Sequence, residues 1–173
     1  HSYGLIGIDA YPVEIEVDVS SGLPSVSIVG LPDSAIKESR ERVRSGIKNS
    51  GFRFPADKIT INLAPANVRK EGCAFDLPIA LGILAAAEQI SQDILQGIFF
   101  VGELSLNGEL REVKGALAMS LATKKKKSGQ LILPAQNAKE AAVVRETRVY
   151  AFKTLRDCVD ALYHPESLCP AVP

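Results

Sequence analysis

Apolar and polar residues alternate along much of the first thirty positions. In the stretch 13–20, VEIEVDVS, valine and isoleucine occupy every second position and acidic residues lie between them. A period of two is typical of an antiparallel strand with one face in water. The stretches 3–11 and 25–30 also read as strands, and Pro12 and the turn sequence SSGLP separate them from the first. We expect the three strands to form a meander.

Helical periodicity replaces this alternation after Pro32. Over 33–50 we expect a helix that Asp33 or Ser34 caps and that Gly51 ends. Its buried stripe is expected at three positions: Ile36, Val43 and Ile47. A second helix, over 76–87, is apolar nearly all round, which predicts a central position in the fold.

Strand and helix patterns alternate through the later part of the chain. We expect strands at 58–64, 98–105, 109–113, 129–134 and 149–152, and helices at 115–127, 135–144 and 154–163. Asn107-Gly108 is a strong turn dipeptide and predicts a hairpin around it. The predicted fold class is therefore α/β (α+β), with an N-terminal β meander followed by alternating helices and strands.

The size and charge of the chain restrict the classes of partner. It has 173 residues, of which 46% are hydrophobic, enough for one well-packed core. Its 20 Lys and Arg balance 20 Asp and Glu, so any electrostatic binding must come from a local patch. No apolar run is long enough to span a membrane and no signal-peptide pattern is present, so we expect a soluble, cytoplasmic chain without a membrane partner.

The last residues differ in composition from the rest. PESLCPAVP contains three prolines and follows the last predicted helix. Such a segment reads as a linker. We expect one domain over 1–163 and a linker over 164–173 that leads toward a further module.

The sequence lacks the motifs that are typical of nucleotide-binding sites, metal sites and catalytic cysteines. Neither a P-loop nor a GxGxxG motif is present, so we expect no nucleotide or other cofactor in this chain. The three cysteines, Cys73, Cys158 and Cys169, show no CxxC spacing, and we expect no zinc or other metal site. A catalytic cysteine usually needs a histidine as its base. Since His1 and His164 stand near the two ends, Cys73 reads as a half-buried thiol at a helix start.

A basic stripe is the one candidate for nucleic-acid or partner contact. Arg40, Arg44 and Lys48 recur at helical spacing, and Arg69 and Lys70 are expected nearby. One interpretation is a groove for phosphates or for an acidic partner. The other is a solvated helix face, because 33–50 holds five cations and three anions, a net of only +2.

Four blocks in this order carry a family resemblance: GLPDSAIKESRERVRSGIKNSGFRFP, ITINLAPANVRKEGCAFDLPIALGIL, FVGELSLNGELREVKGAL and LILPAQNAKEAA. They resemble the N-terminal, ChlI-type domain of the ComM/YifB family, bacterial AAA+ proteins that are called magnesium-chelatase-like. The resemblance implies the Lon-protease-like form of the ribosomal protein S5 domain 2-like fold.

Lon proteases use a Ser-Lys dyad, and the resemblance assigns its two positions in this chain. In KEGCAFD, Ala74 falls on the serine, and in the later block Leu117 falls on the lysine. Neither side chain can act as a nucleophile or a base, so the resemblance implies no catalysis by this domain. A register slip of one residue leaves an alternative, a Lon-like peptidase that uses Cys73 with Lys114.

The resemblance also implies a setting for the domain. An AAA+ module that follows it would bind ATP and Mg²⁺ and form a hexameric ring, as a DNA helicase for branch migration in natural transformation or recombination. The domain is then expected to contact its own AAA+ module and neighbouring subunits, with DNA as a further candidate partner. A third interpretation is a subunit-docking domain of a magnesium-chelatase-like ATPase, although no porphyrin or metal site is visible in the sequence.

Overall fold

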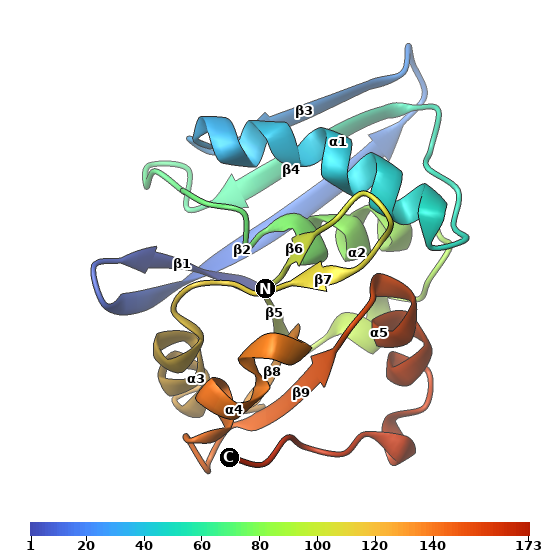
Figure 1. Ribbon diagram of the computed structural model, residues 1–173. Helices are drawn as coiled ribbons and strands as arrows, with labels where there is room; N and C mark the ends of the chain where they lie inside the picture. Colours follow the sequence, from blue (N-terminus) through green and yellow to red (C-terminus); the bar gives the residue numbers. More distant parts are fainter.

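Two sheets organise the chain in the computed structural model, which describes all residues 1–173 (Figure 1). The first sheet has the strand order β1-β2-β4-β3. Strand β1 pairs antiparallel with β2, β2 pairs antiparallel with β4, and β3 pairs parallel with β4. The strands are β1 (Ser2–Ile6), β2 (Asp9–Ser20), β3 (Ser25–Val29) and β4 (Lys58–Ala64).

The predicted meander is wrong at its third strand. Strand β3 does not pair with β2, because β4 lies between them. Between β3 and β4 the chain forms α1 (Ser34–Asn49), and this crossover lets β4 return parallel to β3. Alternation in a strand shows which side chains face the core, but it does not show which strand lies alongside. The correction therefore concerns the neighbours of β3 and leaves its faces as expected.

One face of this sheet is buried beneath two helices. Ile59, Ile61 and Leu63 on β4 are fully buried and belong to the same core as the predicted stripe of α1. The central helix α2 (Asp76–Ala86) is buried along most of its length, as its apolar sequence predicts. A Cβ on Gly82 would stand 2.7 Å from Val17 Cγ2, so this glycine allows α2 to lie close against β2. The α/β class is confirmed.

The second sheet is parallel and has helices on both faces. It consists of β5 (Ile98–Phe100), β8 (Gln130–Pro134) and β9 (Arg148–Phe152), in that order. Side chains of α3 (Ala116–Lys124) and α4 (Ala138–Ala142) pack on one face, and those of α5 (Leu155–Leu162) pack on the other. The predicted hairpin around Asn107-Gly108 is confirmed as β6 (Glu103–Leu104) with β7 (Leu110–Arg111).

Short 3₁₀ turns and an extended tail complete the chain. The turns are η1 (Gln92–Leu95), η2 (Ala135–Asn137) and η3 (Pro165–Ser167). The tail, for which we predicted a linker, runs back to the second sheet, where the Ala171 N–H donates to the Val149 carbonyl at 2.7 Å. None of the helices combines the length and the apolar character needed to cross a bilayer.

A buried ion pair joins the two helices that cover the first sheet. Arg42 on α1 donates from Nε to Asp76 Oδ2 at 2.7 Å and from Nη2 to Oδ1 at 3.1 Å. The backbone N–H of Leu104 in β6 donates to the same carboxylate at 3.0 Å. Burial raises the pKa of Asp76 to about 6, although Arg42 and the Leu104 N–H act in the opposite direction. The pair therefore fixes α1, α2 and β6 relative to one another.

Removing one partner of this pair should cost far more stability than replacing both. Asp76→Leu alone should lower the free energy of unfolding by about 3–5 kcal/mol, because it leaves the Arg42 charge without its partner in a largely buried position. Arg42→Met combined with Asp76→Leu should recover most of that loss. Urea unfolding of the single and double variants measures both values. Additive losses in the double variant would contradict this account.

Candidate functional site

A cavity of about 490 Å³ lies ahead of the start of α2 and contains most of the predicted catalytic positions. Its walls come from β1, from the loop 71–74, from β6 and from the segment between β7 and α3. Cys73, Ala74 and Lys114 all line it. Leu117 does not line the cavity and is 41% exposed on α3. The structure therefore brings three of these four positions together.

The loop that forms one wall is held against the start of α1. Asp33 caps α1 by accepting from the Ile36 N–H at 2.9 Å, as predicted, and its second oxygen accepts from the Gly72 N–H at 3.1 Å. The backbone adds two further bonds, from the Asp33 N–H to the Lys70 carbonyl and from the Lys70 N–H to the Leu31 carbonyl, both at 3.0 Å. One carboxylate thus connects the helix cap with the cavity wall.

Lys70 is a structural residue rather than a surface contact. Its side chain is fully buried, and its ammonium donates to the carbonyls of Gly30, at 2.8 Å, and Pro65. Burial lowers the pKa of this lysine. The prediction of Lys70 as a nucleic-acid or partner contact is corrected accordingly, because its side chain is fully buried and two carbonyls hold its ammonium beneath the surface. Sequence spacing could not distinguish it from its neighbour Arg69, whose side chain is 71% exposed.

The thiol of Cys73 is poorly placed to act as a nucleophile. Burial raises its pKa, and the nearby carboxylates of Glu103, Asp76 and Asp33 raise it further, whereas Arg42 lowers it. A thiol is nucleophilic as its thiolate, so these surroundings reduce its reactivity at neutral pH. The side chain of Ala74, in the same wall, has no reactive group.

Acidic side chains dominate the charge of the cavity. Four carboxylates and one ammonium line it: Asp33, Glu71, Glu103, Glu112 and Lys114. No group of three or more acidic, cysteine or histidine side chains lies close enough to hold a metal ion. Sequence reasoning missed this acidic character because the four carboxylates come from separate segments with no common spacing. A cavity with this charge disfavours phosphate groups.

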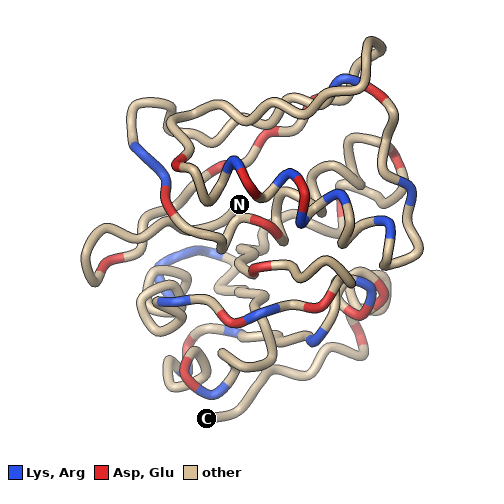
Figure 2. The backbone as a smooth tube through the Cα atoms, turned by 45° about the horizontal axis from the view of Figure 1, so that its top comes forward, with Lys and Arg blue, Asp and Glu red and all other residues tan.

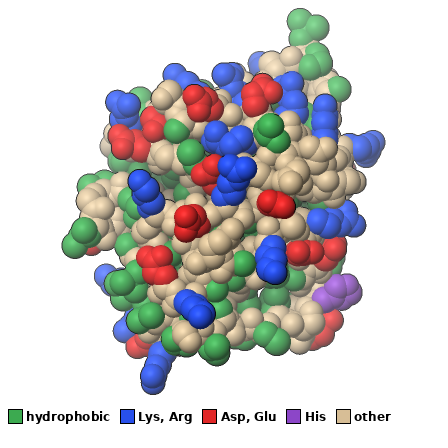
Figure 3. Space-filling model, in the orientation of Figure 1, with side chains coloured by type: hydrophobic (Ala, Val, Ile, Leu, Met, Phe, Trp, Pro, Cys, Tyr) green, Lys and Arg blue, Asp and Glu red, His purple; other side chains and the backbone are tan.

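The remaining residues of the basic stripe lie mostly at the surface, among acidic neighbours. Arg40 is exposed and donates to the carbonyls of Lys37 and Val26, at 3.0 and 3.3 Å. The guanidinium of Arg44 lies over the Phe54 ring, 5.2 Å from its centroid, and Lys48 is exposed. In the first half of α1 Glu38 and Glu41 lie between the basic positions, whereas the second half carries basic residues alone (Figure 2). The face in Figure 3 shows mixed charges over this helix. This distribution favours a solvated helix face over a continuous phosphate-binding groove.

Comparison with known proteins finds matches along most of the chain. The family model described as subunit ChlI of Mg-chelatase matches residues 15–137. Competence protein ComM of Haemophilus influenzae is 46% identical over 168 residues, which are 97% of this chain and 33% of that protein. The protein YifB of Escherichia coli is 50% identical over 137 residues, 79% of this chain and 27% of that protein.

A more distant match agrees with the protease-like sequence pattern. Lon protease 2 of Bacillus subtilis is 24% identical over 167 residues, 87% of this chain and 29% of that protein. The chain therefore spans about a third of the length of the curated relatives that it matches.

The three cysteines should react with iodoacetamide in an order that follows their surroundings. Cys169 is exposed and should react first at pH 7, Cys73 should follow slowly, and the fully buried Cys158 should react only on unfolding. Mass spectrometry of timed samples gives the three rates, with Cys169 and Cys158 as internal references. Faster alkylation of Cys73 than of Cys169 would reveal an activated thiolate and restore the Cys73–Lys114 alternative.

Proposed function

Because the chain belongs to the family of the ChlI subunit of magnesium chelatase and corresponds to the N-terminal domain of ComM and YifB, we propose that it is a non-catalytic accessory domain of a ComM-like AAA+ protein. The observation that supports the proposal is that the two dyad positions assigned by the resemblance carry an alanine and a leucine. Ala74 replaces the nucleophile, and Leu117, at the position of the lysine, lies outside the cavity. Cys73 and Lys114 also line the cavity, but the surroundings of Cys73 raise the pKa of its thiol, which disfavours the nucleophilic thiolate.

The accessory role we propose is docking onto neighbouring parts of a ring. Exposed apolar side chains support it: Leu117 and Leu121 are 41% and 47% exposed on α3, and Val143, next to α4, is 61% exposed. We call these three residues the α3–α4 face. Large apolar side chains on a surface are suited to a protein interface. The proposed partners are the AAA+ module of the same protein and adjacent subunits of a hexamer.

The parent protein, in this proposal, is a cytoplasmic ring ATPase that acts on DNA. ATP and Mg²⁺ would bind to the AAA+ module, and the accessory domain would help to assemble or orient the ring. Helicase activity in branch migration, during natural transformation or recombination, is the proposed setting. The name of the ComM relative, a competence protein, supports this setting. Docking in a magnesium-chelatase-like ATPase remains the second candidate, which the matching family description favours.

Negative charges introduced on the α3–α4 face should weaken docking without unfolding the domain. Leu117→Glu with Leu121→Glu should lower the affinity for the AAA+ module, added as a separate chain, by about tenfold or more, because it places two charges in an apolar contact. Leu106→Glu is the matched control, since Leu106 is 58% exposed in the β6–β7 turn. Calorimetry measures the affinities. Equal binding by both variants, or cleavage of a peptide substrate by the wild-type domain, would overturn the proposal.

DNA contact by the domain itself is a separate prediction, and it depends on basic side chains rather than apolar ones. Arg40, Arg44, Lys48 and Arg69 are the candidates that remain accessible. If they bind phosphates, affinity should fall steeply as salt rises, and Arg40→Glu with Arg44→Glu should abolish binding. Fluorescence anisotropy with single-stranded, duplex and four-way-junction probes tests this. An absence of binding at low salt would assign DNA contact to the AAA+ module.

A further inference from the structure

A run of four lysines at the end of α3 lies beside a second basic segment, 145–148, which leads into β9. A hydrogen bond of 2.7 Å joins the two segments, from Arg148 Nη2 to the Ser128 carbonyl. An ion pair of 2.9 Å between Lys124 and Glu146 joins them again. The six basic residues of this surface, which we call the basic patch, are Lys124, Lys125, Lys126, Lys127, Arg145 and Arg148.

The basic patch differs from α1 in the balance of its charges. Its two segments hold six cations and one anion, Glu146, a net of +5, whereas 33–50 has a net of +2. All six basic residues are exposed. The dipole of α3 favours cations only around its last turn, so it accounts for Lys124 and Lys125 and not for the other four. Because the chain as a whole carries no net charge, this concentration creates a local field that attracts anions.

Half of these side chains have no partner within the chain. Lys124 is held by Glu146, and Arg148 by a carbonyl. The ammonium of Lys126 lies over the Phe99 ring, 5.9 Å from its centroid. The side chains that make no hydrogen bond, ion pair or cation–π contact are those of Lys125, Lys127 and Arg145. Three cations are therefore free to bind an anion from outside.

The composition of the basic patch favours the phosphates of a nucleic acid over an acidic protein surface. Its two segments contain no apolar side chain. The cores of protein interfaces are apolar and aromatic, and lysine is depleted there. Interfaces with nucleic acids are more polar and much more positively charged. Lysine ammonium groups on flexible stems act as point charges for phosphate oxygens, and such contacts carry no direct information on base sequence.

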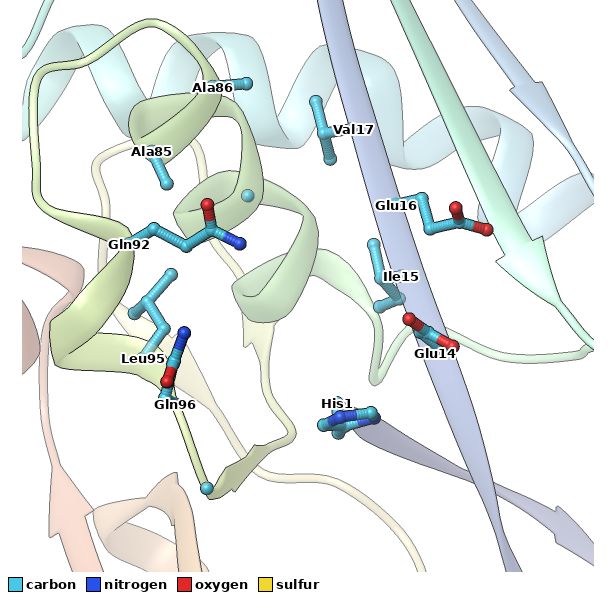
Figure 4. Close-up of a pocket in the computed structure, with 12 residues that line it drawn as sticks. His1, Glu14, Ile15, Glu16, Val17, Ala85, Ala86, Gln92, Leu95 and Gln96 are labelled. Carbon is cyan, nitrogen blue, oxygen red and sulfur yellow. The ribbon is translucent and has the colours of Figure 1, made fainter.

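The two grooves of the protein have the wrong charge for the same ligand. The cavity ahead of α2 is lined by four carboxylates and one ammonium. A second groove, of about 680 Å³, lies between β2 and the end of α2 with η1 (Figure 4). Glu14 and Glu16 line this groove, and no lysine or arginine does. Phosphate groups are therefore disfavoured in both grooves and favoured on the convex basic patch.

We propose that the basic patch binds the phosphate backbone of a nucleic acid, without preference for base sequence. Lys125, Lys127 and Arg145 contact phosphate oxygens, and the other three cations add to the attractive field. The inference rests on the DNA contact of the proposed function and gives that contact a surface other than α1. It does not rest on docking through the α3–α4 face, although the two surfaces adjoin, since Leu121 lies one helical turn before Lys124.

The test compares two triple variants that lose the same charge from different surfaces. The first variant neutralises the three unpartnered cations of the patch: Lys125→Gln, Lys127→Gln and Arg145→Gln. The matched control neutralises three exposed lysines elsewhere: Lys37→Gln, Lys58→Gln and Lys153→Gln. Fluorescence anisotropy with labelled duplexes of two unrelated base sequences, over a series of salt concentrations, measures the affinity and its salt dependence. Thermal unfolding followed by circular dichroism checks that both variants remain folded.

We expect the patch variant to bind both duplexes at least about tenfold more weakly at low salt, and the control variant to bind as the wild type does. The slope of log K against log salt should shrink by about two to three in the patch variant, because each lost phosphate contact removes about 0.9. The two duplexes should bind equally.

Four results would overturn the proposal. Equal losses in the two triple variants would show a dependence on total charge alone. A loss confined to Arg40→Glu with Arg44→Glu would place the contact on α1. Weaker binding of the patch variant to the AAA+ module, with unchanged affinity for DNA, would assign the patch to an acidic protein surface. An absence of DNA binding by the wild type at low salt would remove the proposal and leave docking through the α3–α4 face intact.

Discussion

The contact between Arg42 and Asp76 sets the relation between the two helices on the first sheet. Helix α2 is so apolar that its own surface offers little to define a rotation or a register. Two N–H groups from one guanidinium and a third from β6 fix its first residue at a single place. Dispersion and apolar burial supply the bulk of the packing, and this ion pair adds directional contacts at the start of α2.

The cavity depends on that geometry because its walls start from the same elements. Cys73 and Ala74 stand just ahead of Asp76, so the position of α2 also determines theirs. On the other side, Asp33 and Lys70 hold the preceding loop through backbone carbonyls and N–H groups. None of these contacts involves a nucleophile, so the shape of the cavity does not depend on a catalytic group.

Much of the fold follows from local sequence patterns. The features that were not predicted depend on contacts between segments far apart in sequence. The faces of β2, the stripe of α1, the cap at Asp33 and the turn at Asn107-Gly108 depend on residues close in sequence, and all agree with prediction. The neighbours of β3 depend on where a later strand inserts, which no local pattern records.

The candidate site, like the fold, was predictable only where it depends on residues close in sequence. The resemblance pointed to the loop that forms its wall at 71–74, but the contact of Asp76 with Arg42 and the burial of Lys70 arise between segments distant in sequence. Asp76 lies in the first turn of α2, and its carboxylate is held by Arg42, which stands 34 positions earlier in the sequence.

The insertion of β4 between β2 and β3 has a consequence for how the chain folds. Neither earlier strand can complete its pairing until Lys58–Ala64 is available, so the first sheet closes through contacts between residues far apart in sequence. Such topologies have high contact order and fold slowly, because the entropy of loop closure is lost before the pairing compensates for it. During synthesis, β2 and β3 would emerge with unpaired edges and without the strand that separates them. The charged side chains of β2 then limit premature association of the nascent chain.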